Sequence, residues 1–456
     1  MGVEKIHKLI DSIFTEHLSK TQEFLRIPTI FPENVGLVKA ADWLKEYIEG
    51  LYGQVELVGN KQAPIVYARF DLGREKTILV YGMYDVHPTS GQVWTSPPFA
   101  AHIRDVSGIG PCIIARGACN SKGPLMGFLN AMHAIRQLDE FPVNLILTIE
   151  GEEEIGSPTL PLFYEQNKAQ LKAHAGFEPF WAEYGTDVSK PTLSLGTKGV
   201  VELDLICRGG EWGGPVEYPI HSSVAAWLAS PSWRLINALS TLVGEDEEIR
   251  INGFYEQVVP PRPEDEKLLE RLESSFDEKE MLSILGARRF KYNLHGIDLL
   301  RKYLFSPTLH VSVSPQADDG VVSPVSRARL MIRLVPEMDP IQTVKKVQTH
   351  LGKKGFKDIE VLVRSSYPWS RTSIDTQVVQ AMIETYKYHG VEPQILPISS
   401  SATPYYLFSQ VLGIPYVWGG LGRAGRSHAP DEFASVEGLR LFEKSIVTFL
   451  HKFASS

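Results

Sequence analysis

The sequence has 456 residues, of which 43% are apolar and 22% are charged, and a net charge of −8. A chain of this length exceeds one ordinary hydrophobic core, so two domains are expected, and the acidic balance without a Lys/Arg-rich run argues against nucleic acid as a partner. No apolar run approaches the roughly 20 residues of a membrane span, and the three cysteines, Cys112, Cys119 and Cys207, provide no disulfide framework, which fits a reducing cytoplasm.

Apolar residues at helical spacing predict that residues 1–50 are mainly helical. Short apolar runs typical of buried strands follow, and two of them enclose a segment, 121–138, whose apolar residues recur at the spacing of one helix face. That segment is predicted to be a helix with Asn120 or Ser121 as its N-cap. Strands that alternate with helices predict an α/β layered fold with a mostly parallel sheet. The strand-like runs are 64–70, 76–82 and 144–150.

The pattern changes after residue 196, where VVELDLICR alternates apolar and polar residues as a half-buried strand does. The elements beyond it indicate an α+β insert, and the α/β pattern returns near residue 369. We therefore expect an α/β domain formed by 1–196 and 369–456, interrupted by an α+β domain over 197–368. In the insert, helices are predicted at 231–243, 263–276 and 340–352, and strands at 308–315, 327–335 and 358–364. Beyond it, helices are predicted at 376–390 and 437–453, and strands at 394–399 and 414–420.

Four polar clusters lie at or near the ends of predicted strands. Ligands of open α/β sheets bind outside the carboxyl ends of the strands, so these clusters are candidates for one common site. The acidic run EGEEEIGS is the most suggestive of them, with a solvated acidic turn as the plain alternative, and a single histidine such as His428 is more often structural than a ligand. The clusters are Met83 with Asp85, Asn120, the run at 150–157, and GGLGRAGRSHAPDE at 419–432.

Eight short motifs are informative as a set, because their order and spacing along the chain can be compared with those of known families. They are FLRIPTI, VWTSPPF, ARGACNSKGPL, EGEEEIGSPTL, SLGTKG, NGFYEQV, MIRLVP and SHAPDE. Over nearly the whole chain they resemble the M20 family of dizinc amidohydrolases, which includes carnosine dipeptidases, succinyl-diaminopimelate desuccinylase, acetylornithine deacetylase and glutamate carboxypeptidase. The dipeptidase branch is the most similar. The resemblance implies a three-layer catalytic domain with an inserted lid and dimerisation domain, a homodimer, and a small substrate that carries a carboxylate.

Two of the five metal-binding positions implied by the resemblance carry altered residues. Met83 stands where the family has a zinc-binding His, and Asn120 stands where it has an Asp that bridges two metal ions. Two dications about 3.5–4 Å apart repel each other, and an ionised bridge offsets much of that repulsion. An amide is neutral and a thioether is soft, whereas zinc beside carboxylates prefers imidazole and oxygen. A two-metal centre is therefore predicted to be absent, with no zinc or a single weakly held zinc ion.

The other positions of the family site are kept. Glu153 aligns with the general base, and Asp85 aligns with the aspartate of the His-x-Asp motif, so both are assigned to catalysis. Glu154, Glu178 and His428 align with metal ligands. Without a metal pair these carboxylates would face each other in one cleft, so at least one should hold a proton near neutral pH and form an acid–base pair.

The resemblance also implies residues that bind the substrate. Arg333 aligns with a lid arginine that grips a substrate carboxylate. His221 aligns with a lid histidine that reaches the partner subunit's site and stabilises the oxyanion. The turn SSATP at 400–404 aligns with a turn that contacts the carboxylate. The predicted substrate-binding set is Arg333, Ser401, Thr403, Asn120 and Met83.

Three functions remain open from the sequence. The first is a dipeptidase or amidohydrolase with a site that holds at most one metal ion. The second is a metal-independent enzyme on the same scaffold, in which Glu153 performs proton transfer, isomerisation or amide-bond formation. The third is a non-catalytic binding homologue. Metal analysis of the purified protein would separate the first from the other two, and Glu153→Gln would separate the second from the third.

Overall fold

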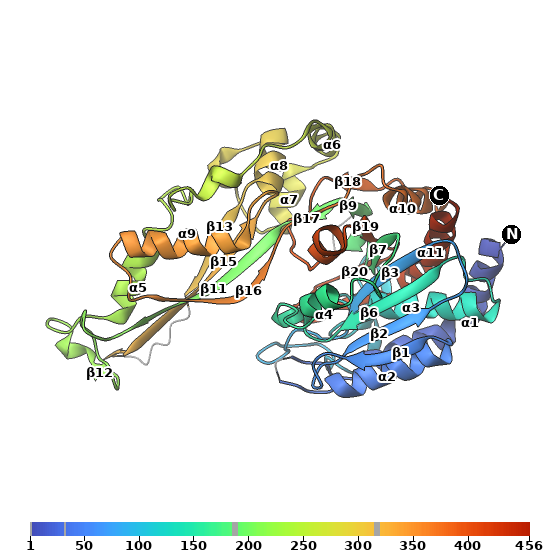
Figure 1. The fold of residues 1–456 in the computed structure, drawn as a ribbon, viewed down its shortest axis with the longest axis horizontal. Coiled ribbons are helices and arrows are strands. Elements are labelled where there is room, and N and C mark those ends of the chain that lie inside the picture. Colours follow the sequence, from blue (N-terminus) through green and yellow to red (C-terminus); the bar gives the residue numbers. More distant parts are fainter. Residues whose placement is uncertain (1, 32, 185–189, 314–319) are drawn as a thin grey trace.

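The computed structural model describes residues 2–31, 33–184, 190–313 and 320–456. Figure 1 shows two bodies: one contains both chain ends, and the middle of the chain forms the other. The last two residues of the strand predicted at 308–315 lie outside the described residues.

A six-stranded sheet forms the centre of the body that contains the chain ends. The pairings β6–β3, β3–β7 and β7–β19 are parallel, and β1–β2 and β2–β6 are antiparallel. The prediction of a mostly parallel sheet is confirmed, with an antiparallel edge that the sequence did not indicate. In spatial order the strands are β1 (Gln54–Val58), β2 (Ile65–Phe70), β6 (Asn144–Glu150), β3 (Thr77–Met83), β7 (Ala175–Pro179) and β19 (Tyr416–Gly419).

Both faces of this sheet are covered, which explains why its strands are apolar throughout. On β3, Ile78 and Val80 belong to one buried cluster, whereas Leu79 and Tyr81 belong to another. The first cluster packs against α1 (Gly2–Leu25), α2 (Leu37–Gly50), α3 (Lys122–Gln137), α10 (Gln377–Tyr388) and α11 (Val436–Ser455). The second packs against α4 (Leu160–Gln166) and the π-helical segment Leu407–Leu412. The layers are therefore helix, sheet and helix.

A second sheet, which the sequence did not predict, joins distant segments beside the central sheet. Its order is β4 (His102–Val106), β5 (Gly110–Ile114), β21 (Phe433–Ser435), β20 (Arg423–Gly425) and β8 (Glu183–Tyr184). The pairing of β5 with β21 brings the chain before Asn120 next to the segment that follows His428.

The other body is built on a four-stranded antiparallel sheet. Its own buried cluster is formed wholly by residues between 201 and 359. The domain boundaries expected at 196/197 and 368/369 stay a prediction. The strands, in spatial order, are β13 (Thr308–Val313), β15 (Val325–Leu334), β11 (Gly199–Arg208) and β16 (Glu360–Tyr367). Its helices are α5 (Pro231–Leu239), α6 (Pro263–Glu273), α7 (Glu278–Ile284), α8 (Gly296–Phe305) and α9 (Pro340–Lys353).

Short strands lie outside these larger sheets. They are β9 (Thr192–Ser194), β10 (Gly196–Thr197), β12 (Ile220–His221), β14 (Val321–Val322), β17 (Ser370–Arg371) and β18 (Gln394–Leu396). β9 pairs with β18 and β10 pairs with β17, so the chain leaves and re-enters the α/β body at neighbouring points.

Two local predictions need correction, and a third is confirmed in part. The helical region at 1–50 is interrupted between Leu25 and Leu37, because Pro28 cannot continue a helix and Gly36 has a φ of 70°. The helix predicted at 231–243 ends at Leu239. The prediction of Asn120 or Ser121 as the N-cap of α3 is confirmed for Ser121, which holds that position without a side-chain capping bond.

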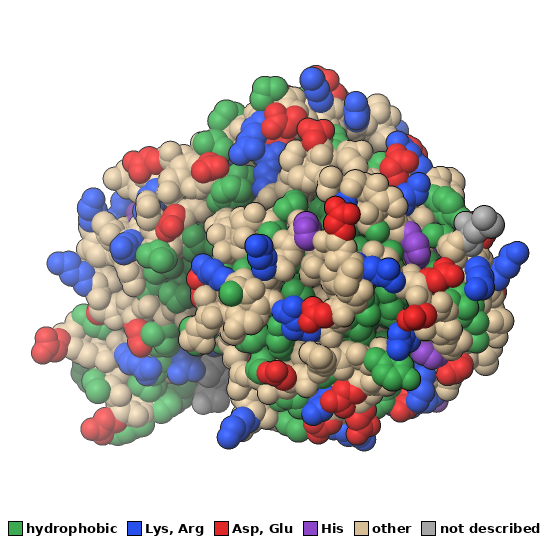
Figure 2. Space-filling view, turned by 45° about the vertical axis from the view of Figure 1, so that its right-hand side comes forward, with side chains coloured by type: hydrophobic (Ala, Val, Ile, Leu, Met, Phe, Trp, Pro, Cys, Tyr) green, Lys and Arg blue, Asp and Glu red, His purple; other side chains and the backbone are tan. Residues whose placement is uncertain are grey.

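The charge distribution on the surface and the character of the helices are relevant to the expectation that neither nucleic acid nor a membrane is a partner. Positive and negative side chains are interspersed over the face drawn in Figure 2. Among the described residues, no helix has the length and apolar character needed to cross a bilayer. The three cysteines are free and buried. The cytoplasmic location stays a prediction.

Candidate active site

Three neighbouring strands end in acidic residues at the same edge of the central sheet. β3 is followed by Asp85, β6 is followed by Glu153 and Glu154, and Glu178 lies near the end of β7. Because β6, β3 and β7 are adjacent and parallel, their carboxyl ends meet at this edge. The structure therefore gathers the predicted acidic residues into one cluster.

Asp85 is buried beneath the acidic turn. Its Oδ2 atom accepts the backbone N–H of Glu154 at 2.9 Å, and its Oδ1 atom has no hydrogen-bond partner among the described residues. Burial, followed by the charges of Glu154 and Glu150, holds the pKa of Asp85 well above its usual range. Asp85 thus anchors the turn that carries the predicted base.

Glu153 opens that turn, the short helix Glu153–Ile155. Burial raises the pKa of its carboxyl well above the usual value, and the charges of Glu154 and Asp85 raise it further. A positioned carboxyl can take a proton as general base and return it as general acid in a later step. The arrangement therefore suits Glu153 for the general-base role that the resemblance implied.

Asn120, Glu154 and His428 contact each other directly. Asn120 Nδ2 donates to Glu154 Oε1 at 3.2 Å and lies 3.0 Å from His428 Nε2, which is 3.1 Å from Glu154 Oε1. Asn120 Oδ1 accepts from Ser121 Oγ at 3.0 Å, so the amide turns its donor end toward the other two. The bond to Glu154 raises the pKa of His428, and the ring of His87 stacks on His428 with centroids 4.8 Å apart.

Glu178 has a partner that the sequence analysis missed. Tyr405 Oη donates to Glu178 Oε2, and both side chains are buried. Burial raises the pKa of Glu178 to about 8, which the Tyr405 bond partly offsets. Met83 is also buried, at the end of β3. Tyr405 follows the SSATP turn directly, but no local pattern in the sequence links it to Glu178.

Glu432 holds the loop that carries Asn120, and it was also missed. Its Oε1 atom accepts the backbone N–H groups of Gly117, Cys119 and Asn120 at 3.1, 2.9 and 2.8 Å. Its Oε2 atom accepts from Arg116 Nη1 at 2.6 Å, and this ion pair is completely buried. The final residue of SHAPDE therefore fixes the position of Asn120.

Arg333 lies on the face of the inserted sheet that also carries Tyr367. Tyr367, Val200 and Arg333 lie opposite each other across β16, β11 and β15, and residues paired in this way point to the same face. Tyr367 Oη donates to Ser157 Oγ at 3.1 Å, just beyond the acidic turn. With strands about 4.8 Å apart, the backbone of Arg333 is about 10 Å from that of Tyr367.

Arg333 has a buried cationic neighbour in Lys198. Burial, followed by the charge of Arg333, lowers the pKa of Lys198 to about 7. Lys198 Nζ donates to the carbonyl oxygens of Tyr303 and Ser306, each at 2.8 Å. Tyr303 Oη in turn lies 2.8 Å from Ser400 Oγ, which ties the inserted body to the SSATP turn.

The remaining predicted residues differ in position. Ser401 is exposed, with its Oγ 2.8 Å from Ser399 Oγ, and Thr403 is half-buried two residues before Tyr405. His221 is exposed on β12, which Figure 1 shows at the far tip of the inserted body, away from β3 and β6. Within one chain the structure does not bring His221 to Glu153.

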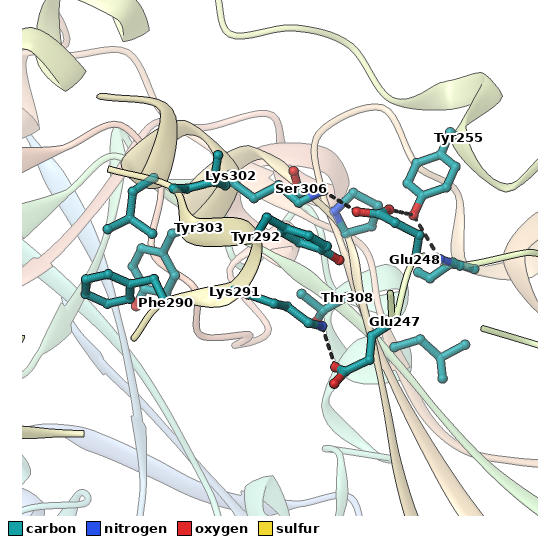
Figure 3. A pocket seen from close by; sticks show the side chains of 15 residues that line it. Glu247, Glu248, Tyr255, Phe290, Lys291, Tyr292, Lys302, Tyr303, Ser306 and Thr308 are labelled. Carbon is teal, nitrogen blue, oxygen red and sulfur yellow. Dashed lines mark hydrogen bonds and ion pairs between the residues drawn. The ribbon is translucent and has the colours of Figure 1, made fainter. Parts of the chain in front are cut away.

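A separate cavity of about 250 Å³ lies in the inserted body beside α8 and β13 (Figure 3). Its charged side chains already pair with each other: Lys302 Nζ is 2.7 Å from Glu248 Oε1, and Tyr255 Oη donates to Glu248 Oε2 at 2.8 Å. No predicted catalytic or substrate-binding residue lines it, so we assign the chemistry to the acidic cluster.

The sequence matches the family described as "Peptidase family M20/M25/M40" over residues 79–452, and the chain belongs to this family. It is 24% identical to the Cys-Gly metallodipeptidase DUG1 of Saccharomyces cerevisiae over 100% of this chain and 99% of that protein. It is 25% identical to the human Beta-Ala-His dipeptidase over 83% of this chain and 76% of that protein. A solved M20 family metallo-carboxypeptidase, Sso-CP2 from Sulfolobus solfataricus, is 32% identical, covers 97% of this chain and 100% of its own, and superimposes with a TM-score of 0.87.

The donor set does not fit the metal pair that the family implies. Among the described residues, no group of three His, Cys, Asp or Glu side chains is placed to hold an ion. A structural or catalytic zinc takes at least three protein ligands, whereas Glu154 and His428 supply two, and both contact the donor end of Asn120. Glu178 is paired with Tyr405. The roles of the side chains of this site are therefore derived without a metal ion.

Proposed function

We propose that this chain is an amide-bond enzyme of the amidohydrolase or dipeptidase type that acts on a small peptide or N-acyl amino acid with a free carboxylate. The observation that carries the proposal is the acidic cluster itself. It holds Glu153 at the carboxyl edge of the central sheet, and the hydrogen bond from Tyr367 to Ser157 joins the inserted sheet, which also carries Arg333, to the end of its acidic turn. The relatives named for dipeptidase and carboxypeptidase activity support the substrate class.

In this proposal each group has a defined task. Arg333, with Ser401 and Thr403, binds the substrate carboxylate and places the amide over the acidic cluster. Glu153 takes a proton from the attacking water and returns it to the leaving nitrogen. His221 from a second copy of the chain donates to the developing oxyanion.

The test is Glu153→Gln, assayed on a panel of dipeptides and N-acyl amino acids. Loss of the base should lower kcat by about 10²–10⁴-fold while binding measured by calorimetry persists. Glu152→Gln is the matched control, because Glu152 is the neighbouring acid and its side chain accepts from Asn60 Nδ2 at 2.6 Å. Turnover that survives in Glu153→Gln would contradict the proposal.

A second candidate is a metal-independent reaction other than hydrolysis, such as proton transfer next to a carbonyl, isomerisation or amide-bond formation. The direct contacts among Asn120, Glu154 and His428 favour it, because they engage the remaining ligands. Elemental analysis of protein purified without chelator, combined with assays with and without added zinc, separates the two. Hydrolysis that requires zinc would remove this candidate, and binding without any turnover would instead favour a non-catalytic homologue.

A further inference from the structure

Glu178 lies at a position where the family's residues hold a metal ion, and in this chain it is already paired. Tyr405 Oη donates to its Oε2 atom. The Tyr405 ring is held between Phe408, Tyr416 and Trp418, with centroids 6.3, 5.2 and 4.9 Å away. A buried phenol fixed on three sides cannot swing away at low cost, so the hydroxyl stays on the carboxylate.

Asn120 plays the matching part on the other side of the cluster. Its amide nitrogen lies within 3.2 Å of both Glu154 Oε1 and His428 Nε2, and its oxygen is taken by Ser121 Oγ. Glu432 fixes the backbone at Asn120 through its N–H group. A metal ion needs an acceptor here, and the structure presents a donor.

We propose that the chain replaces both ions of the family's metal pair with its own hydrogen-bond donors, the Tyr405 hydroxyl beside Glu178 and the Asn120 amide between Glu154 and His428. The replacement therefore involves three residues, Met83, Asn120 and Tyr405, although the sequence motifs reveal only the first two. It does not depend on which amide is the substrate or on whether the reaction is hydrolysis.

If this proposal holds, restoring the two altered ligands alone does not restore binding of two metal ions. The double variant Met83→His/Asn120→Asp recreates both altered ligands but leaves Tyr405 on Glu178. We expect it to retain at most one zinc ion per chain after equilibration with zinc and desalting, measured by mass spectrometry of the metal. Adding Tyr405→Phe, which removes only the hydroxyl, should raise the number to two.

The matched control is Met83→His/Asn120→Asp/Tyr406→Phe. Tyr406 is the next residue, its ring lies 6.1 Å from that of Tyr367, and among the described residues no hydrogen bond joins it to Glu178, whose partner is Tyr405. We expect this control to hold as little zinc as the double variant. Two zinc ions in the double variant, or no increase in a folded triple variant with Tyr405→Phe, would overturn the proposal.

If the triple variant fails to fold, a second measurement still tests the proposal. Tyr405→Phe, Glu178→Gln and the pair together form a double-mutant cycle on the native background, read from urea unfolding midpoints. Residues in direct contact give non-additive effects. Additive midpoint shifts would show that the Tyr405 hydroxyl and the Glu178 carboxylate do not interact, which would contradict the proposal.

Discussion

At the scale of the residue, the buried carboxyl of Glu150 should make the free energy of unfolding depend on pH. Its Oε1 atom accepts from Tyr81 Oη and Ser157 Oγ at 2.8 and 2.7 Å, and burial raises its pKa from 4.5 to about 7. Because the folded pKa lies above the unfolded one, the folded state binds the proton more tightly. The stability contributed by this carboxyl is full below pH 4.5 and is lost as the pH rises to about 7.

We therefore expect Glu150→Gln to remove a pH-dependent loss of stability. A shift of one pKa unit corresponds to about 1.4 kcal/mol, so the variant should gain about 3 kcal/mol relative to the native chain between pH 4.5 and 7. Urea unfolding at pH 5 and pH 8 measures this difference. Glu264→Gln, at an exposed position, serves as the control. Equal effects of Glu150→Gln at both pH values would contradict the expectation.

The residues that the sequence did and did not reveal differ in a physical way. Glu153 and Glu154 follow a buried strand directly, so strand order alone places them at the binding edge. The contacts of Tyr405 and Glu432 instead join positions 227 and 312 residues apart. Such contacts arise from tertiary packing and leave no local pattern, so the roles of Tyr405 and Glu432 could be found only in the structure, whereas the substitution at Asn120 was visible in the motifs.

At the scale of the element, the start of α3 determines where Asn120 lies. The Gly123 N–H donates to Gly117 O at 2.9 Å, and a Cβ atom on Gly123 would lie 2.0 Å from Ala118 O. That contact is far closer than atoms allow, and the neighbour is backbone, so the helix start or the loop must shift. Gly123 therefore permits the close approach that positions the site.

Gly123→Ala should destabilise the chain by about 1–3 kcal/mol and lower activity, because the loop that carries Asn120 must move. Gly50→Ala is the control: it lies at the end of α2, and a Cβ atom there meets nothing within 4 Å. Urea midpoints and assays of both variants make the comparison. An unchanged midpoint in Gly123→Ala would show that the loop adapts without cost.

Strands could be predicted from the sequence where nearly all of their residues are buried. β3 and β6 lie in the sheet interior and read as continuous apolar runs, whereas β4 is mostly exposed and β21 has three residues. Such short or exposed strands form because the fold brings their partners close. The second sheet was therefore missed, although it carries the link between the segments around Asn120 and His428.

At the scale of the whole molecule, β12, which carries His221, lies at the far tip of the inserted body, whereas β6, which precedes Glu153, lies in the body that contains the chain ends (Figure 1). The same inserted body exposes large apolar side chains, with Val216, Trp227 and Trp233 68%, 86% and 67% exposed. Exposed apolar side chains of this size are common where protein surfaces associate. A second copy that covers this body would allow its His221 to complete the first copy's site.

A mixture of two inactive variants tests this arrangement. Glu153→Gln lacks the base but keeps His221, and His221→Asn lacks the histidine but keeps Glu153. If His221 acts in the partner's site, each mixed dimer has one complete site, and random pairing should restore about one quarter of native activity. If His221 acts within its own chain, every site lacks one group and the mixture stays inactive. Co-expression of two differently tagged variants, followed by tandem purification, isolates the mixed species, in which the restored fraction should rise to about one half because one of its two sites is complete.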